Sequence, residues 1–184
     1  MTAPLIVRCA LFVLAAAACV WGAATDRPLA GPAVAAAVLV GHVWTLRDPL
    51  RQLRPLLVIA VIGTAAESAW IAAGMYAPAG SMRGTVLCPL WVTAMWLNGA
   101  IFAQGVLLNR LPLRLAPLAG AIAAPLGFVA ADGVGAILIA WPLAVALAAL
   151  ALHSAVALWL VMWYVTAAEK TFANNATTTS ERRA

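Results

Sequence analysis

The chain contains the stretch Gly63-Thr-Ala-Ala-Glu67-Ser-Ala-Trp70-Ile-Ala-Ala-Gly74-Met-Tyr76, in which one carboxylic acid interrupts a run of apolar residues. This run belongs to a segment, residues 55–76, that is long and apolar enough to cross a bilayer as a helix. An ionisable side chain inside such a segment is costly, so it usually marks a functional site. Glu67 is therefore the first candidate site residue, and the segment around it predicts a membrane protein.

The composition of the whole chain agrees with this prediction. Of its 184 residues, 65% are hydrophobic and only 9% are charged, and the mean hydropathy is +0.99. Soluble domains average about 45–50% apolar and 25% charged residues, so a water-soluble fold would leave much apolar surface exposed. The length leaves room for about six spans of roughly 20 residues each. We therefore expect an all-α, polytopic membrane helical bundle that forms a single domain.

Polar turns and prolines divide the chain into six predicted transmembrane helices. They cover approximately residues 4–24, 28–46, 55–76, 86–108, 115–139 and 143–166. The first also resembles a signal peptide, with Arg8 before an apolar core and a possible cleavage site at Gly22-Ala23-Ala24, and this alternative stays open. The fifth contains two prolines and the pair Gly133 and Gly135, so we expect it to be kinked or broken. Residues 169–184 are polar and small, and they predict a disordered cytoplasmic tail.

The distribution of basic residues predicts how the bundle is oriented. With the N-terminus inside, nine of the 11 Lys and Arg residues fall on the cytoplasmic side, and only Arg27 and Arg83 fall outside. This asymmetry follows the positive-inside rule and favours an even number of spans, since both termini lie on the basic side. The net charge of +5 is spread over the ends of the apolar runs and forms no dense patch, so nucleic-acid binding is not expected.

The sequence contains no motif of a soluble enzyme or of a metal site. Its three cysteines lie inside apolar runs without CxxC or Cys/His spacing, and there are only two histidines. GxSxG, HExxH and P-loop motifs do not occur. We therefore expect no metal site with a conventional ligand set, and the sequence leaves any cofactor unknown.

Three polar residues are predicted to lie at the same depth in the bilayer. At about 1.5 Å per residue, Glu67 is about 18 Å from the inner end of its span, while Asn98 and His153 are about 18 Å and 15 Å from the outer ends of theirs. Each therefore lies near the middle of a hydrocarbon core about 30 Å thick. An acid, an amide and an imidazole at one level predict a shared polar site that faces the bundle interior. Asp132 is predicted to lie closer to the outer surface.

The candidate roles follow from side-chain chemistry. Glu67 and His153 are the candidate catalytic residues, acting as acid or base. The candidate ligand-binding residues are Ser68, Trp91, Trp96, Asn98 and Asp132. A structural interpretation stays open, because intramembrane residues such as Asn98, Gln104 and His153 can join helices by hydrogen bonds, and tryptophans can pack or lie at the interface. Asp132 is equally compatible with a loop at the outer surface.

Three short motifs follow one another along the chain. They are Glu67-Ser68, then Pro89-Leu90-Trp91 with Met95-Trp96, then the segment that runs from Gly120 through Pro125 to Gly135-Ala136. In this order they resemble a bacterial family of small inner-membrane proteins that is catalogued as a domain of unknown function. The resemblance covers most of the chain and implies a multi-pass protein of the bacterial inner membrane, without an established activity.

The chain departs from the pattern of that family at three positions. Ala124, Phe128 and Gly133 stand where glycine, tyrosine and arginine are usual. The loss of the tyrosine and the arginine puts in doubt any role that they have in other members, although Asp132 could supply part of the missing polarity.

Three classes of function remain. In the first, the protein binds or modifies a lipid or isoprenoid within the bilayer at a polar site around Glu67, and membrane lipids are its partners. In the second, it is a small-molecule or proton-coupled transporter in which Glu67 titrates. In the third, it is a membrane scaffold or an assembly partner. The oligomeric state is left open by the sequence.

Overall fold

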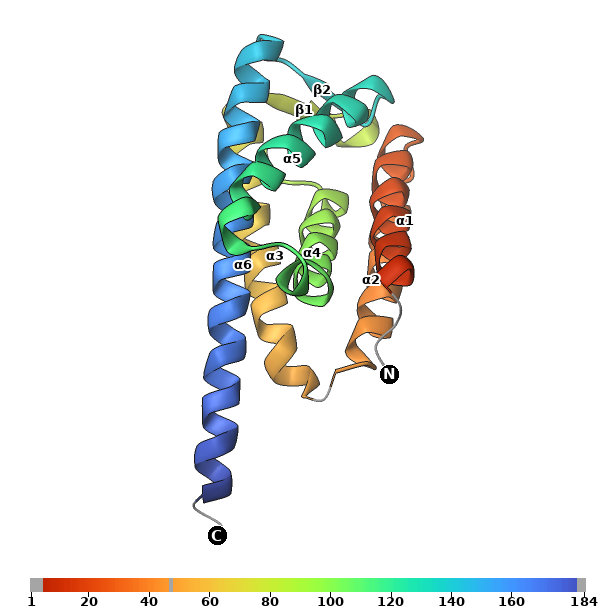
Figure 1. Ribbon diagram of the computed structural model, residues 1–184. Coiled ribbons are helices and arrows are strands. Elements are labelled where there is room, and N and C mark those ends of the chain that lie inside the picture. The colour runs from red at the N-terminus through yellow and green to blue at the C-terminus, as the bar shows by residue number, and fades with distance from the viewer. Residues whose placement is uncertain (1–4, 47, 182–184) are drawn as a thin grey trace.

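The computed structural model describes residues 5–46 and 48–181, leaving aside the side chains of residue 51 and of residues 169–181. The described chain forms six α-helices (Figure 1): α1 (Leu5–Ala24), α2 (Ala30–Val43), α3 (Pro49–Ala72), α4 (Leu90–Gly105), α5 (Ala116–Gly133) and α6 (Leu143–Glu181). Shorter elements are the strands β1 (Tyr76–Pro78) and β2 (Ile137–Ile139) and the 3-10 helices η1 (Gly80–Met82), η2 (Leu107–Asn109) and η3 (Leu113–Leu115). The predicted all-α bundle is confirmed. Five of its helices are long and apolar enough to cross a membrane.

The central helix of the bundle is α4. It packs against α1, α2, α3 and α6, and its polar side chains Asn98 and Gln104 are both buried. On one side of it α1 and α2 lie side by side, and on the other α5 packs along α6 (Figure 1). Because lipid tails are as apolar as leucine, the outward faces of such helices are apolar too, and polar residues are best placed in contacts between helices.

The helices alternate in direction, so α1 begins and α6 ends at the same end of the bundle (Figure 1). The distribution of basic residues likewise places both ends on one side of the membrane, while five of the six described helices are long and apolar enough to cross it. The cytoplasmic location of that end stays a prediction from the same distribution.

A two-stranded ribbon lies at the opposite end of the bundle (Figure 1). β1 and β2 pair antiparallel, with Tyr76 opposite Ile139 and Pro78 opposite Ile137. Each strand comes two residues after a glycine with positive φ, which is 69° at Gly74 and 79° at Gly135. Only glycine adopts this conformation readily, so these two residues turn the chain from the end of a helix into a strand.

The ribbon corrects two of the predicted spans. α3 ends at Ala72 and α5 ends at Gly133, whereas the predicted helices continue to residues 76 and 139. α5 passes through Pro125 as one helix, so the expected interruption falls at the two glycines after it. At its other end α3 is longer than predicted, because it begins at Pro49 and contains Pro55.

The lengths of α2 and α6 also differ from their predicted spans. With 14 residues, α2 is about 21 Å long and shorter than a bilayer core of about 30 Å. The backbone of α6 continues as helix to Glu181, over most of the segment for which the sequence predicts a disordered tail. The Ala-Ala-Glu-Lys run of residues 167–170 consists of strong helix formers, and extending a formed helix is easier than starting one. Residues 182–184 of that predicted tail lie outside the described residues.

A second contact joins the loops at the ribbon end. Asp26, in the turn between α1 and α2, accepts hydrogen bonds from the Ser81 hydroxyl at 2.7 Å and from the Ser81 backbone N–H at 3.0 Å. The Ser81 hydroxyl and backbone N–H hold the pKa of the Asp26 carboxyl below its usual range. The turn after α1 is thereby tied to the loop after β1.

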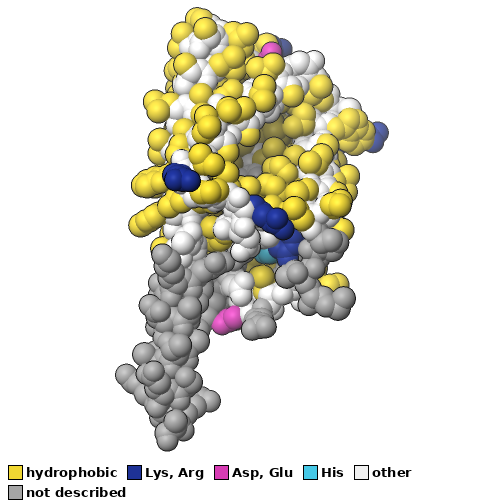
Figure 2. All heavy atoms as spheres, in the orientation of Figure 1, with side chains coloured by type: hydrophobic (Ala, Val, Ile, Leu, Met, Phe, Trp, Pro, Cys, Tyr) yellow, Lys and Arg dark blue, Asp and Glu magenta, His cyan; other side chains and the backbone are white. Residues whose placement is uncertain are grey.

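Apolar side chains cover the outside of the bundle. Figure 2 shows hydrophobic atoms over most of the described face, with few charged groups among them. Val61 and Leu152, both within long helices, are 69% and 71% exposed. Large apolar areas of this kind suit contact with lipid rather than with water.

Candidate functional site

Glu67 lies where α3, β1 and α4 meet. Its side chain is only 4% exposed, and one carboxyl oxygen accepts a hydrogen bond from the hydroxyl of Tyr76 at 2.8 Å. The indole of Trp96, on α4, interacts with the same carboxyl. A buried carboxyl group needs such donors, because burial without a partner costs several kcal/mol. Glu67 therefore joins α3 to β1 through the Tyr76 hydrogen bond and interacts with α4 through Trp96.

The turn at the end of α3 brings Tyr76 back onto Glu67. The backbone N–H groups of Gly74 and Met75 bond to carbonyls in the last turn of α3, those of Ile71 and Trp70. This satisfies the helix end in the manner of a Schellman motif, which favours glycine at the turn. The Tyr76 ring, which is buried, also contacts Phe128 of α5 edge to face, with the ring centroids 5.2 Å apart.

A glycine on α3 makes room for Trp96. A Cβ atom placed at Gly63 would overlap the Trp96 ring, so the absence of a side chain lets the indole lie directly on the α3 backbone. Gly63 precedes Glu67 by four residues and therefore lies on the same face of the helix. Trp96 is thus held at one point by the backbone at Gly63 and at another by the Glu67 carboxyl.

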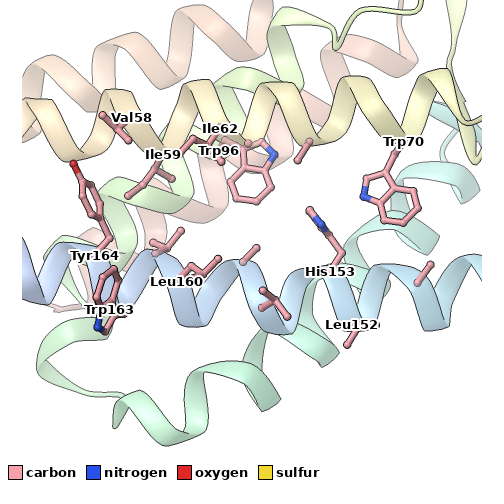
Figure 3. A pocket seen from close by; sticks show the side chains of 16 residues that line it. Val58, Ile59, Ile62, Trp70, Trp96, Leu152, His153, Leu160, Trp163 and Tyr164 are labelled. Atoms are coloured by element: carbon pink, nitrogen blue, oxygen red, sulfur yellow. The ribbon is translucent and has the colours of Figure 1, made fainter.

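His153 projects from α6 into the space between two tryptophans (Figure 3). Its ring centroid lies 5.8 Å from that of Trp70 and 6.1 Å from that of Trp96, and both pairs meet edge to face. Among the described residues, its Nε2 is the one buried side-chain nitrogen or oxygen without a hydrogen-bond partner. Nearly all buried polar atoms in proteins have a partner, so this nitrogen needs an explanation.

These three rings form one end of an apolar groove between α3 and α6 (Figure 3). The groove has a volume of about 650 Å³. Leu152 and Trp163 belong to its lining and are 71% and 52% exposed, so the groove opens sideways, toward the surrounding lipid. The described lining contains no Asp, Glu, Lys or Arg; it comprises Val58, Ile59, Ile62, Gly63, Ala66, Trp70, Trp96, Ala149, Leu152, His153, Val156, Ala157, Leu160, Val161, Trp163 and Tyr164.

The structure places Trp96 next to both Glu67 and His153, whereas the sequence predicts a shared site of Glu67, Asn98 and His153. However, Glu67 does not belong to the lining of the groove. Glu67 therefore reaches the groove only through its interaction with Trp96. This changes its expected role, because an acid or base must reach the reacting atom of a substrate.

Ser68, the next residue, joins α3 to the start of α4. Its hydroxyl donates to the Thr64 carbonyl at 2.8 Å and accepts from the Cys88 backbone N–H at 2.9 Å. Both hydrogen bonds are to the backbone of the protein itself, which gives Ser68 a structural role.

Asn98 does not join the site. Its side-chain amide donates to the Phe12 carbonyl of α1 at 3.0 Å, so it points away from the groove and ties α4 to α1. Of the two roles considered for Asn98, the geometry favours a hydrogen bond that holds two helices together over contact with a ligand.

Replacing Asn98 with leucine, a residue of similar size, should lower the free energy of unfolding by about 0.6–2 kcal/mol, the range found for hydrogen bonds between membrane helices. Unfolding by sodium dodecyl sulfate in mixed micelles, followed by tryptophan fluorescence, measures this change. Ligand binding in the groove should stay as in the wild type. A variant of unchanged stability that loses ligand binding would give Asn98 a direct role instead.

Asp132 and Trp91 also lie apart from the groove. The Asp132 carboxylate accepts a hydrogen bond from the Ile139 backbone N–H at 2.9 Å, which fixes the turn between α5 and β2. Trp91 is 6% exposed and belongs to the hydrophobic core beneath the ribbon, with Tyr76 and Ile137. Neither residue lines the groove.

Sequence reasoning missed three residues of the site: Gly63, Trp70 and Tyr76. The sequence spacing could have indicated two of them. Gly63 lies four residues before Glu67 and Trp70 three residues after it, so both are on the same helix face. Tyr76 had no such signal, since it reaches Glu67 only because the chain reverses at Gly74.

The six packed helices and their apolar outer surface define a multi-pass helical membrane protein. The chain belongs to the family described as "Protein of unknown function (DUF2878)", which matches residues 5–166. The resemblance to an uncharacterised family is thereby confirmed. No curated protein and no solved structure matches the chain.

Proposed function

We propose that this protein binds one hydrocarbon chain of a membrane lipid in the groove between α3 and α6. The observation that carries the proposal is the groove itself, which is apolar and opens sideways on a helical membrane protein. An opening of this kind is in contact with lipid chains at all times, so a chain can enter it without first crossing water.

The lining suits a chain better than a small polar solute. Aliphatic side chains from two facing helices form its walls, among them Ile59 and Ile62 on α3 and Val156 and Leu160 on α6. A hydrocarbon chain that moves from the surrounding lipid into the groove gains little free energy from burying apolar surface, because both places are apolar. Selectivity must therefore come from shape and from close van der Waals contact. Trp70, Trp96 and Trp163 supply large rigid faces for such contact.

Binding is favoured over chemical modification of the lipid. The buried Glu67 takes no part in the lining, which leaves His153 and Tyr164 as its titratable side chains. Of these two, His153 has the buried nitrogen without a hydrogen-bond partner in the described structure. A single imidazole between two indoles can orient a ligand, whereas acid–base catalysis commonly divides the work between two groups.

Filling the groove should abolish binding. In Ala66→Phe the new ring would occupy the groove, since Ala66 belongs to its lining, whereas the adjacent Ala65 is exposed and does not. Both variants and the wild type are reconstituted into vesicles with hexadecanol that carries a diazirine, irradiated, digested and analysed by mass spectrometry. We expect the wild type and Ala65→Phe to be labelled on α3 and α6 along the groove, and Ala66→Phe to lose this labelling.

The contrary result is equally clear. Labels spread evenly over all lipid-facing helices, with the same pattern in Ala66→Phe, would show that the probe meets the protein only as bulk lipid and would overturn the proposal.

A further inference from the structure

We infer that the lipid in the groove is uncharged and carries one hydrogen-bonding group, a hydroxyl or a carbonyl, which binds His153 Nε2. This inference rests on the proposed function and adds the chemical class of the ligand and its direction in the groove.

The unpartnered Nε2 is the first argument. The described part of the chain satisfies the buried polar atoms of Glu67, Asn98 and Tyr76 with its own groups, and leaves this nitrogen alone without a partner. The atom lies in a ring at the end of the groove, between Trp70 and Trp96 (Figure 3). A neutral imidazole nitrogen is a donor or an acceptor according to the tautomer. A hydroxyl complements either form, and a carbonyl complements the donor.

The absence of charge from the lining is the second argument. A phosphate or ammonium head group at this place would need a charged or strongly polar partner, and the described lining residues include no Asp, Glu, Lys or Arg. His153 is also ten residues into α6, about 15 Å along the helix and therefore near the middle of a bilayer core. Moving a formal charge to that depth is expensive. A small neutral head group avoids this cost.

The lining of the groove indicates the direction in which the hydrocarbon chain of the ligand lies. On α6 the lining begins at Ala149 and continues past His153 to Tyr164. The eleven residues from His153 to Tyr164 correspond to about 16 Å. The lining residues of α6 between these two are apolar, and only the His153 end has a buried polar atom without a partner in the described structure. The polar group of the ligand therefore lies between the indoles, and its chain extends toward Trp163 and Tyr164.

Three photoactivatable probes with the same 16-carbon chain test this inference. Two are hexadecanols with the diazirine beside the hydroxyl or at the chain end, and the third is the hexadecyl phosphate with the chain-end diazirine. We expect the first alcohol to label residues near 153 and the second to label residues near 164. We expect the phosphate to label the groove at least about tenfold less than the matching alcohol, because the lining offers its charge no partner.

His153 variants supply the second part of the test. His153→Phe keeps an aromatic ring but removes both nitrogens, and should weaken alcohol binding about two- to tenfold, the range for one net hydrogen bond. His153→Gln retains a hydrogen-bonding amide and should stay closer to the wild type. Both variants are first checked for a monodisperse elution profile, and the probe with the chain-end diazirine shows whether the groove is intact.

The possible outcomes separate the inference from the function on which it rests. If the groove is labelled but the phosphate labels as strongly as the alcohol, or the two alcohols label the opposite ends, the inference fails and lipid binding stands. If His153→Phe and the wild type bind the alcohol equally, it fails in the same way. If no probe labels the groove, both proposals fail.

Discussion

Replacing Gly120 with valine is expected to destabilise the protein by about 3 kcal/mol, since a side chain at this position has no space and overpacking of this kind costs about 1–3 kcal/mol or more. A Cβ atom at Gly120 would overlap the backbone carbonyl oxygen of Ser154 on α6, and would lie 3.1 Å from the Cβ of Leu158. Backbone atoms cannot move aside as a flexible side chain can. α5 would therefore have to move away from α6 at this contact.

Gly127, on the same helix, provides the matched control. A Cβ atom at this position would meet nothing within 4 Å, so Gly127→Val should change the free energy of unfolding by less than about 1 kcal/mol. Titration with sodium dodecyl sulfate in mixed micelles measures both variants against the wild type. Equal stability of the two variants would show that the close approach of α5 to α6 contributes nothing to the fold.

This contrast reflects what holds a membrane bundle together. Lipid gives little hydrophobic driving force between helices, so their association depends on close van der Waals contact and on hydrogen bonds. Gly120 on α5 and Gly63 on α3 serve the first purpose, because each lets a neighbouring group lie directly on the helix backbone. Asn98 serves the second. A small residue on a lipid-facing side, such as Gly127, serves neither.

The helices of the fold could be predicted from the sequence because their signal is strong. Long apolar runs separated by prolines and charged turns identify membrane helices, and the structure contains six helices in the predicted order. The ribbon could not be predicted in this way. Its strands have three residues each, which is too short for an alternating pattern to appear, and their apolar residues look like the ends of the preceding spans.

Counting residues predicts how deep each candidate residue lies, but not the side of its helix on which the side chain lies. Counting residues along each span places Glu67, Asn98 and His153 at one level, yet only Glu67 and His153 share contacts with Trp96. Asn98 is two residues after Trp96 and must point to another side of α4, because residues two apart on a helix do not face the same neighbour. The sequence contained this information, and the helix period rather than the depth would have separated the two residues.

The second large effect concerns Glu67. Glu67→Leu should lower the free energy of unfolding by about 1–3 kcal/mol, because it leaves the buried Tyr76 hydroxyl without its acceptor. It also removes the carboxyl with which the Trp96 indole interacts. Glu67→Gln should cost no more than about 1 kcal/mol. The indole N–H can only donate, and the amide oxygen of the glutamine can accept from it. The tyrosine oxygen can also accept, so the amide N–H of the glutamine can donate to it.

A double-mutant cycle with Tyr76→Phe tests this account of Glu67. The Tyr76 hydroxyl donates to the carboxyl at 2.8 Å, so removing it first should make Glu67→Leu less costly, by about the 1 kcal/mol of one hydrogen bond. The same cycle measured on groove labelling should show a loss with Glu67→Leu, since Trp96 is then free to leave the wall. If Glu67→Gln instead abolishes function as completely as Glu67→Leu while the protein stays folded, the proton of the carboxyl is what matters. Glu67 would then be a proton carrier, as a proton-coupled transporter requires.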